Sequence, residues 1–145
     1  MRYSAEVLGR VQALARVGAL PADAPNVGTG EAGTLDAGTV TRIQVRVAAG
    51  TVAEARYQVF GCSAAIASAS LVAERLEGAP LEAGRALTAG DVIDALHLPA
   101  ERAHVAHLAV RAAQAAIAEV EGKRLEGRGF SPGRADGTEV PALRE

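Results

Sequence analysis

The sequence predicts an α+β domain in which an antiparallel strand pair is followed by helices. Two observations support this fold class. Apolar and polar side chains alternate through residues 40–60, which is the period of strands with one buried face. Residues 101–121 then repeat apolar side chains at helical spacing. Strands grouped together and followed by grouped helices are typical of the α+β class.

The composition is that of one globular domain. Of the 145 residues, 49% are hydrophobic but only 3% are aromatic, so the core must be built from Ala, Val, Leu and Ile. The 15 basic and 17 acidic residues give a net charge of -2, and this balance argues against nucleic acid or an anionic membrane as the partner. No apolar run approaches the roughly 20 residues of a membrane span, and the amphipathic start has no secretory signal.

The strand pair has a recognisable turn between its two halves. In residues 39–47, Ile43, Val45 and Val47 alternate with polar side chains, and residues 52–60 alternate in the same way. The dipeptide Ala49-Gly50 lies between them. We therefore expect an antiparallel hairpin with one buried face and one wet face. On this pattern, Arg42, Gln44 and Arg46 belong to the wet face.

Helical periodicity predicts four helices around the hairpin. They are expected over residues 4–17, from just after Cys62 to Gly78, from the capping residue Thr88 to before Pro99, and over about 101–121. Residues 18–38 hold five glycines and two prolines and are expected to be loop, as is the linker with Pro80 and Gly84. We expect a folded domain over residues 1–122 and a disordered tail over 123–145.

The segment GTGEAG, residues 28–33, matches the dinucleotide-binding fingerprint by letter. That motif requires a strand before it and a helix that opens at its third glycine. Here Pro25-Asn26 precedes the segment and a loop leading to a strand is expected to follow. We therefore interpret it as a flexible glycine loop and not as a nucleotide site.

Cys62 is the most informative single residue. It follows a strand and Gly61, and it begins a helix rich in small residues. Unpaired amides and the helix dipole at such a position stabilise a thiolate, which is the form that binds metal. A buried cysteine that acts as a small hydrophobe is the other interpretation. A single cysteine excludes an internal disulfide and is consistent with a reducing, cytoplasmic location.

Two histidines share a face of the last helix. His104 and His107 are three residues apart, and Arg111 continues the same face. Histidines at this spacing can share a metal ion, although on a surface helix they are more often solvated. Asp36 lies in the glycine-rich segment, where turn formation is the usual role of an aspartate.

Several segments together resemble one family. In order and spacing, NVGTGEAGTLDAGTV, the hairpin, FGCSAAIASASLV and LPAERAHVAHLAVRAAQAAI are similar to the iron–sulfur cluster scaffold proteins of the IscU/NifU type. The resemblance covers roughly residues 3–121, and FGC with its small-residue helix is the most specific part. It implies a SufE/NifU-like fold, which is a three-stranded antiparallel meander with helices packed on one face. The third strand is not evident from the residue pattern.

The resemblance also indicates a metal site, with Cys62 and His104 as its principal residues. Cys62 matches the family's central cysteine, and His104 matches the histidine beside the last cysteine. The other two cysteines fall on Ala37 and Val105, and the family's aspartate falls on Thr39. Asp36 and His107 are weaker candidate metal ligands. The family's chaperone-recognition stretch is only half kept in residues 98–102, so delivery by that chaperone is not implied.

Ligand counting limits what one chain can hold. A two-iron cluster normally takes four protein ligands, mostly thiolates. One chain offers Cys62, His104 and at most one carboxylate, Asp36. Two copies of Cys62 and two of His104 in a symmetric dimer would total four. A single zinc or iron ion bound by Cys62, His104 and a carboxylate or water is the less demanding alternative.

Two classes of function follow. The chain is either a divergent assembly scaffold that holds iron, zinc or a cluster transiently, or a cluster-free accessory protein that keeps the scaffold shape. In both cases the resemblance implies a cysteine desulfurase or other assembly factors as partners, and the first adds apo client proteins and a homodimer. An independent enzyme is not expected, because no nucleophile–base pair or carboxylate dyad stands out.

Overall fold

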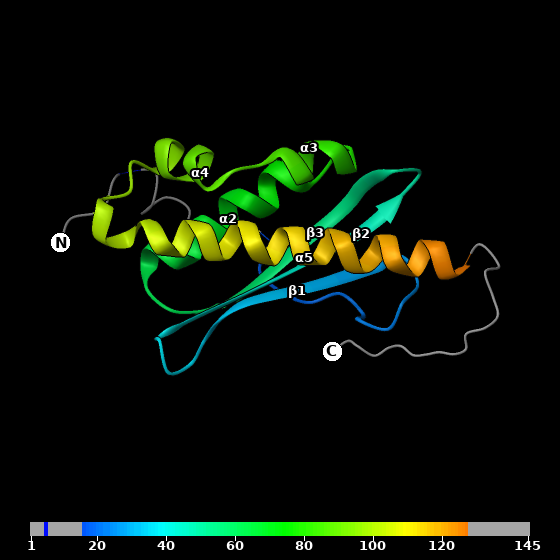
Figure 1. Ribbon diagram of the computed structural model, residues 1–145, viewed down its shortest axis with the longest axis horizontal. Coiled ribbons are helices and arrows are strands. Elements are labelled where there is room, and N and C mark those ends of the chain that lie inside the picture. The colour runs from blue at the N-terminus through cyan, green and yellow to red at the C-terminus, as the bar shows by residue number, and fades with distance from the viewer. Residues whose placement is uncertain (1–4, 6–15, 128–145) are drawn as a thin grey trace.

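The structure, a computed structural model, describes Ala5 and residues 16–127, with side chains through Lys123. A three-stranded antiparallel sheet in the order β1-β2-β3 is covered by helices on one face (Figure 1). The elements are β1 (Val27–Thr34), β2 (Thr39–Ala48), β3 (Thr51–Phe60), α2 (Ser63–Leu76), α3 (Leu81–Ala86), α4 (Ala89–Leu96), η1 (Ala100–Arg102) and α5 (Ala103–Gly127). The α+β meander is confirmed.

The helix expected over residues 4–17 lies mostly outside the described residues. Of that range, Ala5 is helical, whereas Arg16 and Val17 form a turn and a single bridge to β3. In the part of the chain that the structure describes, no helix is long and apolar enough to cross a membrane.

The antiparallel β2–β3 hairpin and its turn at Ala49-Gly50 are confirmed. Ile43 pairs with Tyr57 and Val45 pairs with Ala55. All four side chains are at most 2% exposed, because they face α2 and α5. The turn places Ala49 and Gly50 at φ values of 54° and 79°. Such positive φ values match the twist that a tight hairpin requires.

The expectation of a loop over residues 28–33 is wrong, because this segment lies entirely within β1. The glycines that suggest a loop are there for close packing. A Cβ on Gly28 would lie 2.0 Å from the Ala116 carbonyl oxygen, and one on Gly30 would lie 2.0 Å from that of Ala112. The backbone of α5 therefore rests directly on the backbone of β1, and only residues without a side chain permit that contact.

The remaining helices agree with expectation except at two places. α4 begins with a capping box, in which Thr88 and Asp91 bond to each other's main chain. The linker expected around Pro80 and Gly84 contains the short helix α3. α5 continues past its expected end near Glu121 to Gly127, and Lys123 donates to the carbonyls of Ala22, Ala24 and Val27 at 2.8–3.1 Å.

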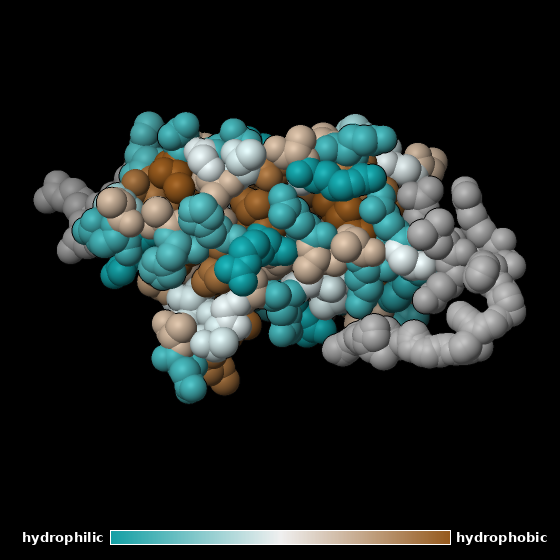
Figure 2. Space-filling view, in the orientation of Figure 1, coloured by the Kyte–Doolittle hydropathy of each residue, from teal (hydrophilic) through white to brown (hydrophobic). Residues whose placement is uncertain are grey.

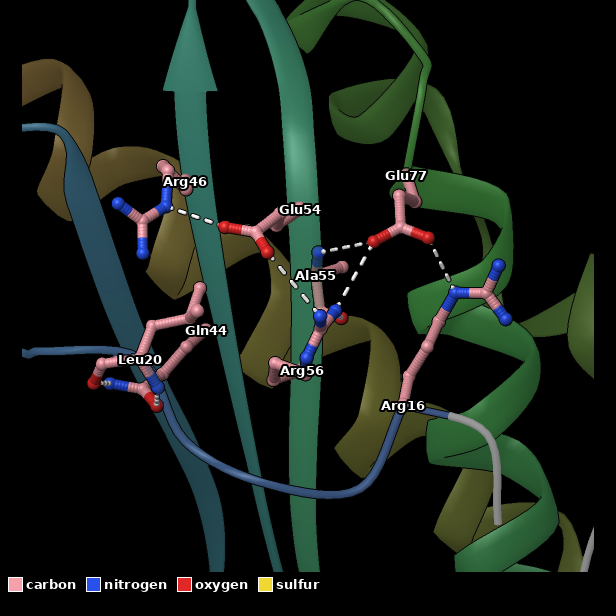
Figure 3. A network of polar contacts seen from close by, with 8 residues as sticks. All are labelled: Arg16, Leu20, Gln44, Arg46, Glu54, Ala55, Arg56 and Glu77. Atoms are coloured by element: carbon pink, nitrogen blue, oxygen red, sulfur yellow. Dashed lines mark hydrogen bonds and ion pairs between the residues drawn. The ribbon is translucent and has the colours of Figure 1, made fainter. Parts of the chain in front are cut away.

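The outer face of the sheet is partly covered by residues 16–20, here called the N-terminal strap. Gln44 was expected on a wet face, yet it is 2% exposed. Its side chain accepts a hydrogen bond from the Leu20 amide at 2.8 Å and donates to the Leu20 carbonyl at 3.0 Å (Figure 3). It also donates to the Thr29 hydroxyl. The expectation fails because the strap, which has no strand or helix pattern, lies over this side chain.

Candidate functional site

Cys62 lies between β3 and α2 as the N-cap residue of α2. Its backbone is extended, and its carbonyl accepts hydrogen bonds from the amides of Ala65 and Ile66 at 3.0 and 3.1 Å. Its side chain makes no capping hydrogen bond, is of intermediate exposure and packs against the edge of the core. The thiol is thus partly accessible at the N-terminal end of α2.

Gly61 allows this connection to run close to β2. A Cβ at this position would lie 3.2 Å from the Cβ of Ala65 and from the Cγ2 of Thr39. Thr39 is 6% exposed, so the residue aligned with the family's aspartate is buried directly behind the Cys62 segment. The site therefore holds a hydroxyl where the resemblance would place a carboxylate.

The β1–β2 turn holds Ala37, the residue that aligns with the family's first cysteine. Ala37 donates its amide to the Thr34 hydroxyl at 3.1 Å, and Gly38 donates to the Leu35 carbonyl at 3.0 Å with φ of +91°. Asp36 and Ala37 are exposed on this turn, which projects from the body of the molecule (Figure 2). The positive φ in this turn accounts for the glycine at position 38.

The start of α5 holds the two candidate histidines and Val105, the residue that aligns with the family's last cysteine. His104 and His107 are both exposed, whereas Val105 is 0% exposed and belongs to the core. The histidines therefore point to solvent on the helix surface, and the position of the family's last cysteine points inward.

These three segments lie at one end of the molecule (Figure 1). Two close approaches join them: Thr39 meets Gly61, and a Cβ on Gly33 would lie 3.3 Å from the Leu108 Cδ1 of α5. Within residues 16–127, no group of three or more His, Cys, Asp or Glu side chains is placed to hold a metal ion. The fold thus brings the candidate segments together, but it does not assemble Cys62, His104, His107 and Asp36 into a complete ligand set.

One hollow in the described part of the chain lies elsewhere. It has a volume of about 390 Å³ and is lined by Pro25, Asn26, Val47, Ala49, Gly50 and Val120. These residues lie just before β1, at the β2–β3 turn and in the later part of α5, at the opposite end of the molecule from the β3–α2 connection (Figure 1). It contains no thiol, imidazole or carboxylate, so it adds nothing to the candidate metal chemistry.

A polar network at the other end of α2 was not expected from the sequence. Glu77 accepts hydrogen bonds from Arg16 at 2.8 Å, from the Ala55 amide at 3.1 Å and from Arg56 at 3.2 Å (Figure 3). Burial alone would raise the pKa of the Glu77 carboxyl. The Ala55 amide, Arg16 and Arg56 outweigh burial and hold this pKa below its ordinary value.

This lowered pKa predicts an acid-sensitive contribution to stability. A carboxyl whose folded pKa is depressed stabilises the fold above its unfolded pKa, and the contribution is lost as the pH falls through the folded pKa. The free energy of unfolding, measured with denaturant from about pH 7 to pH 3, should therefore decline less steeply in Glu77→Gln than in the wild type. Glu82→Gln, at an exposed position on α3, is the matched control. Parallel pH profiles for wild type and Glu77→Gln would contradict the assignment.

Comparison with known proteins identifies relatives. Residues 2–126 match the model of the NifU-like N terminal domain. The iron-sulfur cluster assembly scaffold protein IscU of Escherichia coli K12 is 36% identical over 125 residues, covering 86% of this chain and 98% of that protein. IscU of Haemophilus influenzae is 35% identical, covering 86% and 99%.

Solved structures agree on the fold. A protein described as a scaffold for cluster assembly by the SUF system, from Fervidobacterium islandicum AW-1, aligns with a TM-score of 0.62 at 17% identity, covering 79% of this chain and 96% of that one. A NifU-like N-terminal protein from Brucella abortus aligns with a TM-score of 0.58 at 19% identity, covering 83% and 94%. At these identities the likeness concerns the fold alone.

Proposed function

Because this chain belongs to the family of NifU-like N-terminal domains, we propose that it serves iron–sulfur cluster assembly as a divergent scaffold. In this proposal Cys62 and His104 hold iron, zinc or a cluster transiently as cargo. The single observation that supports it best is the position of Cys62, a thiol of intermediate exposure at the start of α2, at the same end of the molecule as His104.

The number of ligands determines what a monomer can hold. Cys62, His104 and Asp36 supply at most three, and Val105 is buried and apolar. A monomer should therefore not hold a stable two-iron cluster, because sulfur-rich coordination by four ligands is lacking. A single divalent ion whose coordination shell is completed by water requires fewer protein ligands. A cluster shared by two copies, each giving Cys62 and His104, is the oligomeric alternative.

The proposal predicts metal in protein purified without oxygen, and this metal should depend on Cys62. Iron, zinc and acid-labile sulfide would be quantified for wild type, Cys62→Ser and His104→Ala. We expect Cys62→Ser to weaken metal binding by more than the roughly 10–100-fold effect of losing a supporting contact. The control is His97→Asn, which changes an exposed histidine at the end of α4 and tolerates its φ of 55°. A stoichiometric two-iron chromophore on the wild-type monomer without added thiol would contradict the ligand count.

The second candidate is a cluster-free accessory protein that binds a cysteine desulfurase or another assembly factor through its scaffold shape. The observation that favours it is the lack of a three-ligand group within the described residues, with Val105 in the core. If neither metal nor sulfide binds under any condition, this role replaces the first. A pull-down with a purified cysteine desulfurase, compared between wild type and Cys62→Ser, would then test it, because shape-based binding should not require the thiol.

A further inference from the structure

The free edge of β1 is protected over only part of its length. β1 is the first strand of the sheet, so one of its sides has no neighbouring strand. Near its start, Val27 donates its amide to the Ala24 carbonyl and accepts from the Lys123 ammonium at 2.8 Å. The Thr29 amide donates to the Glu119 carboxylate at 2.9 Å. Both charged side chains come from α5.

The rest of this edge has four main-chain groups that point away from the sheet. In a trans peptide, a carbonyl and the next amide point in opposite directions. Because the Thr29 amide points away from β2, the alternation of the antiparallel ladder also directs outward the Thr29 carbonyl, both groups of Glu31 and the Gly33 amide. Within residues 16–127, these four groups have no hydrogen-bond partner, and Glu31 and Gly33 are exposed. A further strand can therefore add here without displacing an existing contact.

α5 restricts which side chains such a strand can carry on its inner face. α5 runs along β1 (Figure 1). The Ala115 Cβ would lie only 2.8 Å from a Cβ on Gly30, yet Ala115 is exposed. Ala115 is therefore close to the sheet and on the side of α5 that faces the open edge. An added strand beside Glu31 would have an inward side chain below Ala115, where only a small one fits.

The same close contact argues against a second copy of this chain as the added strand. Neighbouring strands are about 4.8 Å apart, whereas packed helices need about 8–10 Å between their axes. Each copy carries α5 directly on its own β1. Pairing two β1 edges would therefore bring the two α5 helices closer than helices can pack. The occupant must be an extended segment with no helix of its own over it.

The outer face of the open edge favours a positive charge on that segment. The Glu31 side chain is 58% exposed, and its contact with Arg42 is long, at 3.6 Å. We propose that the open part of β1 binds an extended segment of a partner protein by strand addition. In antiparallel pairing, a central basic residue exchanges two hydrogen bonds with Glu31, and its neighbours two positions away bond to the Thr29 carbonyl and the Gly33 amide.

This binding surface is separate from the proposed metal chemistry. Its four main-chain groups belong to β1, and neither Cys62 nor His104 contributes to it. Binding of the segment is therefore expected without metal and should persist in Cys62→Ser. Its test and the test of the proposed function can fail independently.

The first experiment titrates a synthetic peptide, STAKGTS with both ends blocked, into metal-free ¹⁵N-labelled full-length protein. The amide resonances of Glu31 and Gly33 should shift, and their exchange with solvent should slow. Replacing the peptide's lysine with glutamate should weaken binding by roughly two- to thirtyfold, because like charges then face each other. Replacing its glycine with leucine should weaken binding too, although leucine is the better strand former.

The second experiment tests the direction of the peptide's hydrogen bonds. A methyl group on the main-chain nitrogen of its lysine removes the donor to the Glu31 carbonyl and should weaken binding by about tenfold. A methyl group on the nitrogen of its glycine points away from β1 and should be tolerated.

The matching change in the protein is Glu31→Pro, which removes the outward amide. Proline is tolerated on an edge strand where its missing donor would face solvent. This variant should bind the peptide about tenfold more weakly, and Glu31→Gln, which keeps the amide, should lose less. Circular dichroism and cooperative unfolding confirm that each variant is folded.

Three results would overturn the proposal. The first is that the peptide leaves the Gly33 amide unchanged, and the second is that both methylated peptides bind equally well. The third is protection of the Gly33 amide that rises with protein concentration in the absence of peptide, since the occupant would then be a second copy.

Discussion

Replacing Gly30 with alanine should destabilise the protein by about 3 kcal/mol or more, the upper part of the range for overpacking a core. The new Cβ would lie 2.0 Å from the Ala112 carbonyl oxygen, 2.5 Å from the Ala116 amide nitrogen and 2.8 Å from the Ala115 Cβ. Two of these atoms belong to the helix backbone, so no rotamer change relieves the clash. Either α5 moves away from the sheet or β1 leaves it.

The measurement is the free energy of unfolding from denaturant titration. Gly122→Ala is the matched control, because Gly122 lies in α5 with nothing within 4 Å of an added Cβ. That substitution should stabilise the helix by up to about 1 kcal/mol. Domains of this kind have an unfolding free energy of only about 5–15 kcal/mol, so the difference between Gly30→Ala and Gly122→Ala should be readily measured. Equal stability of Gly30→Ala and wild type would show that α5 does not rest on β1 as described.

Introducing cysteine at both 37 and 105 should produce a monomer that holds a two-iron cluster, provided that the backbone at these positions follows the family and residue 105, buried in the core here, can turn toward Cys62. With Cys62 and His104 the site would then have three thiolates and one imidazole, which satisfies the four-ligand count. Ala37 is exposed on the β1–β2 turn, so Ala37→Cys should hardly alter stability. Val105→Cys changes a fully buried residue to a slightly smaller apolar one and should cost less than about 1.5 kcal/mol.

Anaerobic reconstitution followed by visible absorption, iron and sulfide analysis provides the measurement. The single variants Ala37→Cys and Val105→Cys, and the double variant with Cys62→Ser added, are the controls and should not give a stoichiometric monomeric cluster. If the double variant remains monomeric, folded and free of cluster, then residues 37 and 105 are not brought within reach of Cys62. That result would also weaken the proposed scaffold role.

The sequence predicts those parts of the fold whose pattern depends on local packing. The β2–β3 hairpin alternates because one face meets helices, and Thr88 can be recognised in the sequence as the residue that caps α4. The resemblance implied a third strand, but the residue pattern did not reveal β1, because Gly28 and Gly30 make close contact with residues more than 80 positions later. The burial of Gln44 likewise depends on the strap, whose own sequence has no period.

The same limit applies to the candidate site. That Cys62 begins a helix can be inferred from the strand before it and the small residues after it, and the structure has it as the N-cap of α2. Whether His104, His107 or Asp36 approaches it depends on how the turn and α5 are placed by the whole core. The roles of these residues stay predictions until metal binding is measured.

The backbone contact between α5 and β1 also affects the order in which the fold can form. The Thr29 amide bonds to Glu119 across 90 residues of sequence, and Gly28 and Gly30 meet α5 over a similar separation. A ribosome delivers β1 long before it delivers α5, so the nascent strand has no helix to cover it. Closing so long a loop is entropically unfavourable and slow, which makes the arrival of α5 a late event. Until then the glycine-rich strand has little side-chain packing of its own, and the β2–β3 hairpin with α2 is the part able to fold first.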